Sequence, residues 1–142
     1  MATDQLGRSE RRLGTMALRA LILTLTLATA MIHARLGGPL FTLNAIAYAT
    51  LAAALVLPQP VARARWLVRL VILGFAAATL FGWVLFGARF PLAYLDKAIE
   101  LALVAAVAVD LWLTDGGPVE IARRVLRIPS DVIRFVGDRV RS

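Results

Sequence analysis

Three charged residues within one turn of an apolar segment are the first candidates for chemistry in this sequence. Asp96, Lys97 and Glu100 lie in the first half of the apolar stretch 92–113. At spacings of three and four residues, their side chains project from one face of a helix. A charge within a membrane span is costly and usually faces the protein interior or a water-filled cavity. These residues therefore form either a buried Lys97–Glu100 ion pair or part of a functional site.

Further polar residues are expected at the same end of the molecule. His33 closes the apolar segment 16–34, and Asn44 and Tyr48 lie in the first turns of the segment 40–57. A carboxylate in a low-dielectric setting, like histidine, can exchange protons near neutrality. One interpretation is a proton or substrate site of Glu100 and His33 that opens to the outside. We favour the other, in which the cluster is structural and sets the register of the helices.

Catalytic, metal and cofactor chemistry has little support in this sequence. There is no cysteine and only one histidine, so thiolate chemistry and bis-histidine haem ligation within one chain are excluded. Glycine-rich phosphate loops, nucleophile elbows and metalloprotease motifs are also missing. His33 could ligate a haem or chlorophyll of a larger assembly, but a histidine at a helix end more often binds water or a carbonyl group. We expect no catalytic residue, no metal and no cofactor.

The composition indicates an all-α membrane protein. Hydrophobic residues make up 60% of the 142 residues, against about 45 to 50% in soluble domains. Four apolar segments approach the roughly 20 residues that a helix needs to cross a bilayer. Gly37-Gly38-Pro39, Pro58 and Gly87 with Pro91 separate them. The sequence predicts an antiparallel four-transmembrane-helix bundle with spans at 16–34, 40–57, 66–86 and 92–113.

The distribution of basic residues predicts the orientation of these spans. The net charge is +7, but the arginines lie in loops and tails, which argues against a nucleic-acid partner. Most of the basic residues flank one side of the bundle, and only Arg35, Arg89 and Lys97 fall on the other. Because cytoplasmic loops are enriched in Lys and Arg, we expect residues 1–15 and 114–142 in the cytoplasm. Asp110 then lies near the cytoplasmic interface, where water can solvate it.

Aromatic residues also follow this orientation. Trp66 and Trp112 fall at the predicted cytoplasmic interface. The outer interface is expected to hold a larger group: Phe41, Trp83, Phe86, Phe90 and Tyr94.

The tail 114–142 differs from the predicted bundle because it mixes arginine with regularly spaced aliphatic residues. These spacings fit two short amphipathic helices, broken near Pro129, that lie on the membrane surface. The tail is either a docking surface for a partner or anionic lipid, or an interfacial segment whose arginines only enforce topology. We favour the second interpretation.

Small residues at four-residue intervals predict where helices approach closely. They form three stripes: Ala45, Ala49 and Ala53; Ala98, Ala102 and Ala106; and Gly74, Ala78 and Gly82. We expect the first two stripes to pack the second predicted helix against the fourth. The glycine stripe of the third helix faces either this bundle or another protein.

Parts of the sequence resemble small four-helix integral membrane proteins of bacteria to which no activity is assigned. The resemblance rests on residues 37–44, on Tyr48 and on residues 97–100, and it spans about residues 16–113. It implies a multi-pass protein of the bacterial cytoplasmic membrane, but no activity that can be transferred.

Two functions are compatible with this sequence. The first is a non-catalytic accessory or scaffold subunit of a larger membrane complex, whose partners are the lipid bilayer and other membrane subunits or a second copy of the chain. The alternative is a small transporter or channel, monomeric or homodimeric, that uses the polar cluster around Glu100 and His33. Small multidrug exporters also have four helices, but their essential glutamate lies in the first, which has no acidic residue here. We favour the accessory subunit.

Overall fold

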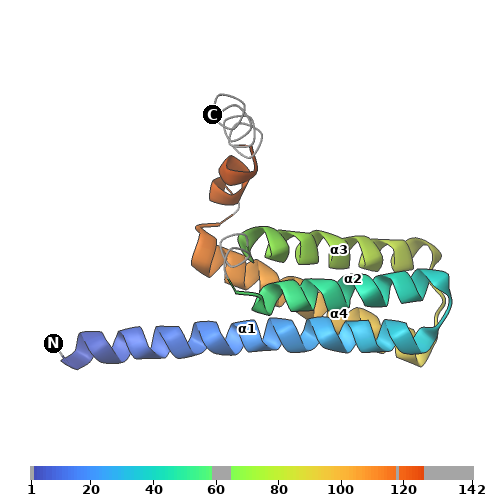
Figure 1. Ribbon diagram of the computed structural model, residues 1–142, viewed down its shortest axis with the longest axis horizontal. Coiled ribbons are helices and arrows are strands. Elements are labelled where there is room, and N and C mark those ends of the chain that lie inside the picture. The colour runs from blue at the N-terminus through green and yellow to red at the C-terminus, as the bar shows by residue number, and fades with distance from the viewer. Residues whose placement is uncertain (1, 59–64, 118, 127–142) are drawn as a thin grey trace, which may run out of the picture. The chain divides into compact units, whose positions relative to one another are not determined.

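A computed structural model of the chain describes residues 2–58, 65–117 and 119–126 (Figure 1). These residues form helices and short connections, and no strand occurs among them. The helices are α1 (Ala2–Leu36), α2 (Pro39–Val56), α3 (Arg65–Phe86) and α4 (Pro91–Asp115), and residues 119–126 are also helical. The chain divides into two compact units, Met1–Asp110 and Leu111–Ser142, which are described separately.

The first helix is longer than the apolar segment 16–34. Residues 2–15 continue it without a break. They contain no proline, and eight of these 14 residues are Arg, Leu, Ala, Gln or Glu, which favour helix. At its carboxyl end the chain reverses through Gly37 and Gly38, whose φ angles are +69° and +83°. Pro39 then occupies the first turn of α2, where its missing N–H costs nothing. This reversal lets α1 and α2 pack side by side.

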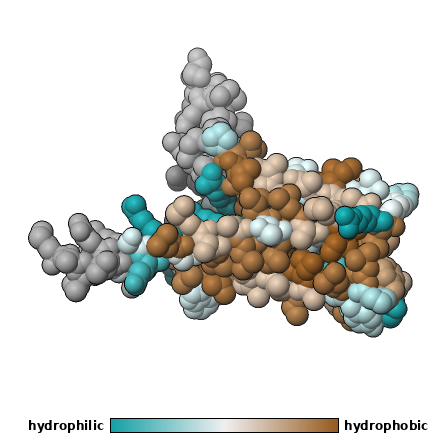
Figure 2. Space-filling view, turned by 90° about the horizontal axis from the view of Figure 1, so that it is seen from below, coloured by the Kyte–Doolittle hydropathy of each residue, from teal (hydrophilic) through white to brown (hydrophobic). Residues whose placement is uncertain are grey.

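Three helices are long and apolar enough to cross a membrane: Arg12–Leu36, Pro39–Val56 and Arg65–Phe86. The helix α4 is not among them because its apolar stretch is interrupted by Asp96, Lys97, Glu100 and Asp110. Large apolar side chains such as Leu43, Phe81 and Leu101 are more than half exposed. Figure 2 shows hydrophobic residues over the middle of the helices and hydrophilic ones gathered towards the ends. This surface suits a lipid environment.

The alanine stripes do not form the packing faces predicted for them. On α2 the buried residues are Ala45, Tyr48 and Ala52, while Ala49 and Ala53 are exposed. On α4, Ala98 and Ala102 are exposed, and only Ala106 of that stripe is buried. The buried face of α4 instead consists of Ala93, Asp96, Glu100, Leu103, Val107 and Asp110, with Ala106 at its edge. Because the carboxylates of α4 have to face inward, the helix is rotated so that Ala98 and Ala102 face out.

The glycine stripe of α3 is not used in packing within the described part of the chain. Gly74 and Ala78 are exposed. A Cβ added at Gly74 or Gly82 would have no atom within 4 Å outside its own helix backbone and immediate chain neighbours.

The interior of the first unit has two polar clusters separated by apolar side chains. One cluster contains His33 and Glu100, and the other contains Arg69 and Asp110. Between them along the helices lie Ile22 of α1, Ile72 of α3, and Leu103 and Val107 of α4, all 0 to 1% exposed. The two clusters are about 15 Å apart, judged from the ten helical residues between Glu100 and Asp110.

In the second unit, the end of α4 is joined to the helix 119–126 by a glycine turn. Gly116 and Gly117 both have φ of +84°, and Arg124 Nη1 donates a hydrogen bond to Asp115 Oδ1 at 2.8 Å. The second amphipathic helix predicted for the tail, after Pro129, lies outside the described residues.

Candidate functional site

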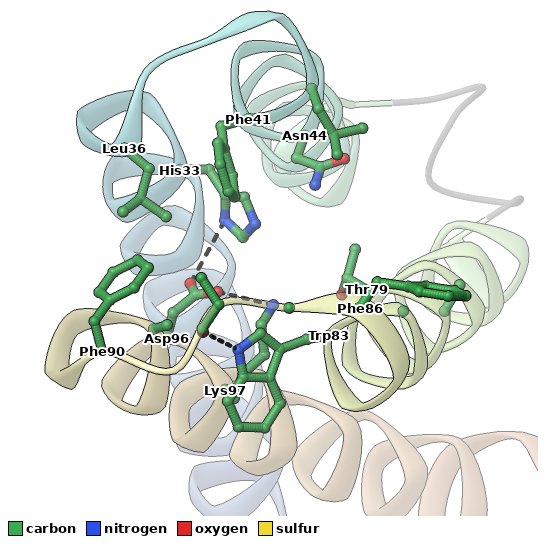
Figure 3. Close-up of a pocket in the computed structure, with 16 residues that line it drawn as sticks. His33, Leu36, Phe41, Asn44, Thr79, Trp83, Phe86, Phe90, Asp96 and Lys97 are labelled. Carbon is green, nitrogen blue, oxygen red and sulfur yellow. Dashed lines mark hydrogen bonds and ion pairs between the residues drawn. The ribbon is translucent and has the colours of Figure 1, made fainter.

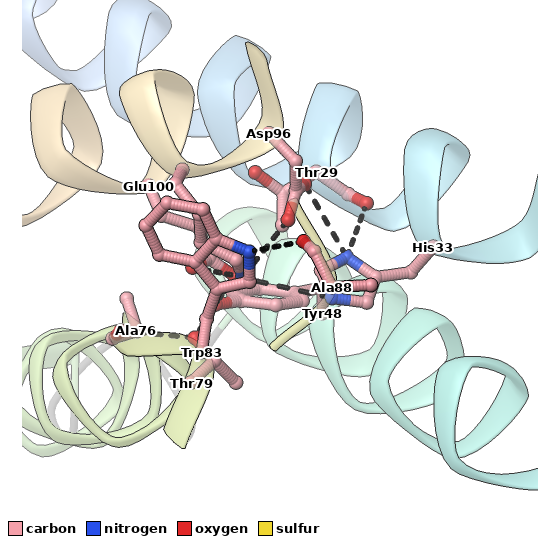
Figure 4. A network of polar contacts seen from close by, with 10 residues as sticks. Thr29, His33, Tyr48, Ala76, Thr79, Trp83, Ala88, Asp96 and Glu100 are labelled. Carbon is pink, nitrogen blue, oxygen red and sulfur yellow. Dashed lines mark hydrogen bonds and ion pairs between the residues drawn. The ribbon is translucent and has the colours of Figure 1, made fainter. Parts of the chain in front are cut away.

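The predicted polar cluster contains a buried histidine, His33, whose Nδ1 faces a backbone carbonyl group. The side chains on the buried face of α1 follow helical spacing: Ile22, Thr26, Thr29, Ala30 and His33. His33 Nδ1 lies 3.0 Å from the Thr29 carbonyl oxygen (Figure 4). Because a carbonyl oxygen only accepts, Nδ1 carries the hydrogen of this bond. The other ring nitrogen, Nε2, is 4.0 Å from Glu100 Oε1 and is the position at which the imidazole can take up a proton.

Lys97 joins the two carboxylates of α4. Its Nζ is 2.9 Å from Asp96 Oδ2 and 2.6 Å from Glu100 Oε2, so the ion pair expected between Lys97 and Glu100 is present. Asp96 and Glu100 are 1% and 0% exposed, which removes them from water almost completely. In such surroundings, a charge is tolerated only when it is paired and hydrogen-bonded.

Tyr48 links this cluster to α2 and α3. Its hydroxyl donates a hydrogen bond to Glu100 Oε1 at 2.9 Å and lies 3.2 Å from Thr79 Oγ1. Its ring packs edge-on against Phe75, with centroids 4.9 Å apart. Thr79 is absent from the residues singled out in the sequence, although a hydroxyl in the otherwise apolar middle of α3 was a signal for it. Both carboxylate oxygens of Glu100 are thus occupied.

The carboxylate of Asp96 has fewer hydrogen-bond partners than that of Glu100. Its Oδ2 contacts Lys97, but its Oδ1 is buried without a hydrogen-bond partner and lies 3.5 Å from His33 Nδ1, whose hydrogen bonds to Thr29. With His33 neutral, the two carboxylates and one ammonium group leave one negative charge in excess. The free acceptor position on Asp96 Oδ1 is one that a hydrogen-bond donor or a positive group of a ligand could contact.

The cluster forms one wall of a pocket of about 480 Å³ (Figure 3). Its polar lining consists of His33, Asn44, Thr79, Asp96 and Lys97, and its aromatic lining consists of Phe41, Trp83, Phe86 and Phe90. The sequence predicts all four of these aromatic residues only as interface anchors. The pocket has the size of sites for small organic ligands, which are about 300 to 1,000 Å³ and combine apolar walls with a few polar groups.

Trp83 is held in place at the edge of this pocket. Its indole N–H donates a hydrogen bond to the Ala88 carbonyl oxygen at 3.0 Å. The Arg89 guanidinium carbon lies 4.0 Å from the ring centroid, a distance at which cation–π attraction is effective. The turn 87–90 therefore positions one aromatic wall.

Of the six predicted site residues, five form one contact network, and Asn44 remains apart from it. Asn44 lines the pocket but makes no hydrogen bond with the described residues around it. The donor atoms of His33, Asp96 and Glu100 lie within 4.8 Å of one another, close enough to share a metal ion. Lys97, however, already contacts both carboxylates. The geometry is therefore closer to an ion-pair network than to an open metal site.

Asp110 belongs to the second polar cluster, and its surroundings differ from those expected. It is 0% exposed and forms an ion pair with Arg69 Nη1, with Arg19 Nε at 3.9 Å. The expectation that water solvates Asp110 is therefore wrong. The position of a residue along a helix indicates its depth, but the rotation of α4 towards α1 and α3 decides its exposure.

Comparison with protein-family models, curated proteins and solved structures finds no match to this chain.

Proposed function

We propose that the chain is a four-span antiparallel protein of the bacterial cytoplasmic membrane with both termini in the cytoplasm. The charges of α4 are compatible with a fourth span, because Asp96, Glu100 and Asp110 are buried and paired. The surface of α4 carries exposed apolar residues, including Leu95, Leu101 and Val109. In this orientation, the pocket beside His33 opens towards the outside, and Arg19, Arg65 and Arg69 lie near the cytoplasm.

Within this topology, we propose that the protein is a small transporter that exchanges an amphipathic cation for a proton. The observation that carries the proposal is the pocket of about 480 Å³, whose polar wall has a buried Asp96 oxygen without a hydrogen-bond partner among the described residues. This oxygen can accept a hydrogen bond from a ligand or contact its positive charge. The aromatic walls would hold the apolar body of the ligand, and their ring faces attract cations.

Proton coupling follows from the charge of the cluster. His33 faces Asp96, Lys97 and Glu100 of α4 and Tyr48 of α2. When His33 takes a proton at Nε2, the excess negative charge is neutralised and a cation gains less from binding. A proton and a cation are therefore expected to compete for the cluster, which is the coupling that exchange requires.

A carrier fits the interior better than a channel does. The side chains of Ile22, Ile72, Leu103 and Val107 fill the space between the two polar clusters. A polar solute that enters from the outer side can pass this layer only if the helices rearrange, as alternating-access carriers do.

Uptake of phenyltrimethylammonium into proteoliposomes that are acidic inside tests this function. The wild type is expected to accumulate the cation above protein-free liposomes, and the neutral isostere tert-butylbenzene should not compete. Asp96→Asn removes one charge-assisted contact and should weaken apparent affinity about tenfold or more. Glu120→Gln, which removes an exposed carboxylate outside the pocket, is the matched control and should transport normally. Absence of uptake, or normal uptake by Asp96→Asn, would rule out the proposed transporter.

An accessory subunit of a larger membrane complex remains the second candidate function. It is favoured by the exposed glycine stripe of α3, where no described residue packs against Gly74. Purification in a mild detergent should then retain another membrane subunit or a second copy, and a photo-crosslinker at Ala78 should capture it. A crosslinker at Ala98 on α4 is the control, because Ala98 is also exposed. A monomer that gives no Ala78-specific product would exclude this role for α3.

A further inference from the structure

A second pocket, at the opposite end of the first unit, has excess positive charge. It has a volume of about 190 Å³, and the charged residues that line it within the described part of the chain are Arg19 of α1, Arg65 and Arg69 of α3, and Asp110 of α4. Three guanidinium groups and one carboxylate leave two positive charges in excess. We call this site the arginine pocket.

Among the described residues that line the arginine pocket, Asp110 is the single carboxylate, and its charge balances only one of the three arginines. Arg69 contacts Asp110 through Nη1 and donates from Nε to the Arg65 carbonyl oxygen at 3.2 Å. Arg19 is half-exposed, and its Nε lies 3.9 Å from Asp110 Oδ1. Arg69 therefore neutralises the carboxylate, and Arg19 and Arg65 supply the excess charge.

Arg65 retains an unused donor in a buried position. Its Nη2 donates to the Leu57 carbonyl oxygen at 3.1 Å, which restrains the guanidinium group. Its Nε is buried and has no hydrogen-bond partner. A buried N–H without an acceptor is costly, and an anion in the pocket would satisfy it.

We propose that the arginine pocket binds the phosphate group of an anionic phospholipid. Planar guanidinium groups match phosphate oxygens in charge and geometry. The same pocket is lined by the apolar side chains of Ile22 and Leu55, along which an acyl chain can pack. A free phosphate ion shares the headgroup chemistry but makes no use of these apolar walls. The site is independent of the cation pocket and of the transport proposed for it.

Lipid titrations of the purified protein, followed by native mass spectrometry, test this site. Phosphatidylglycerol is expected to bind about tenfold more tightly than phosphatidylcholine with the same acyl chains. Arg19→Gln and Arg65→Gln should each weaken phosphatidylglycerol binding about tenfold, the effect of losing one charged hydrogen bond. Arg12→Gln is the matched control, because Arg12 is an exposed arginine of α1 outside the pocket. Its affinity should stay within about twofold of wild type.

The variants, together with a titration of inorganic phosphate, distinguish specific lipid binding from general surface attraction and from binding of a soluble anion. If Arg65→Gln does not fold, the half-exposed Arg19 still provides a decisive variant. Equal losses in Arg12→Gln and Arg19→Gln would indicate general surface attraction and overturn the proposal, as would wild-type affinity in Arg19→Gln. Inorganic phosphate, added to protein in phosphatidylcholine nanodiscs, distinguishes the source. Arginine-dependent thermal stabilisation by phosphate, without preference for phosphatidylglycerol, would mean that the ligand is a soluble anion rather than a lipid.

Discussion

Replacing Lys97 with methionine is expected to lower the free energy of unfolding by about 3 to 5 kcal/mol, the usual cost of removing one partner from a buried ion pair. The physical reason is the burial of both carboxylates that Lys97 contacts, since Asp96 and Glu100 are 1% and 0% exposed. Without the ammonium group, two negative charges face each other in a low-dielectric interior. Unfolding by titration with sodium dodecyl sulfate from a mild detergent, followed by circular dichroism, measures the loss.

The double variant Lys97→Met, Glu100→Gln distinguishes charge from packing. It removes one positive and one negative charge, so the cluster returns to the net charge of the wild type. Most of the lost stability should therefore be recovered. Arg35→Met is the matched control, because Arg35 is an exposed cation near His33 at the end of α1. Its effect on the free energy of unfolding should stay within about 0.5 kcal/mol. If Lys97→Met is as mild as this control, the cluster does not depend on the ion pairs.

Replacing Asp110 with alanine is expected to have a similar effect at the other end of the unit, again about 3 to 5 kcal/mol. Asp110 is fully buried and forms an ion pair with Arg69, whose side chain is 11% exposed. Its removal leaves the buried guanidinium group without this carboxylate and places three arginines around one small pocket. The same detergent unfolding titration measures the change.

Two further variants define the origin of the Asp110 effect. In Arg69→Leu, Asp110→Leu both charges are replaced by apolar groups, and a substantial part of the stability should return. Glu120→Gln disrupts the exposed pair with Arg123, in which the two side chains are 43% and 65% exposed. Such pairs contribute at most about 1 kcal/mol. A loss in Asp110→Ala no greater than in Glu120→Gln would show that the Arg69–Asp110 contact does not stabilise the fold.

The two clusters suggest a division of roles along the helices. The cluster with Asp96 and Glu100 has one negative charge in excess and adjoins an aromatic pocket, which suits a cation or a proton. The arginine pocket has two positive charges in excess and suits a phosphate group. The apolar layer between them keeps the two kinds of ligand apart. Transport at one end and lipid binding at the other can therefore be tested independently.

The four long helices and the connections between them were predictable from the sequence, but the extension of α1 to Ala2 was not. Runs of apolar residues, interrupted at Gly37-Gly38-Pro39, at Pro58 and at Pro91, mark where the chain can remain helical and where it must turn. Short connections force neighbouring helices to alternate in direction, so residues near the outer ends converge. The sequence therefore places His33, Tyr48 and Glu100 at the same end of the predicted bundle.

The rotation of each helix about its axis was decided only by the tertiary structure. The apolar residues of α4 occur on all of its faces, so their spacing does not distinguish the inner face of the helix from the outer one. Pairing of its carboxylates with Lys97, Tyr48 and Arg69 determines which face is buried. That rotation turns Ala98 and Ala102 outward, buries Asp110 and leaves one Asp96 oxygen without a hydrogen-bond partner. Sequence alone therefore indicated most members of the cluster around Glu100. Packing added Thr79, paired Asp110 with Arg69 and decided which polar atoms remain available for a ligand.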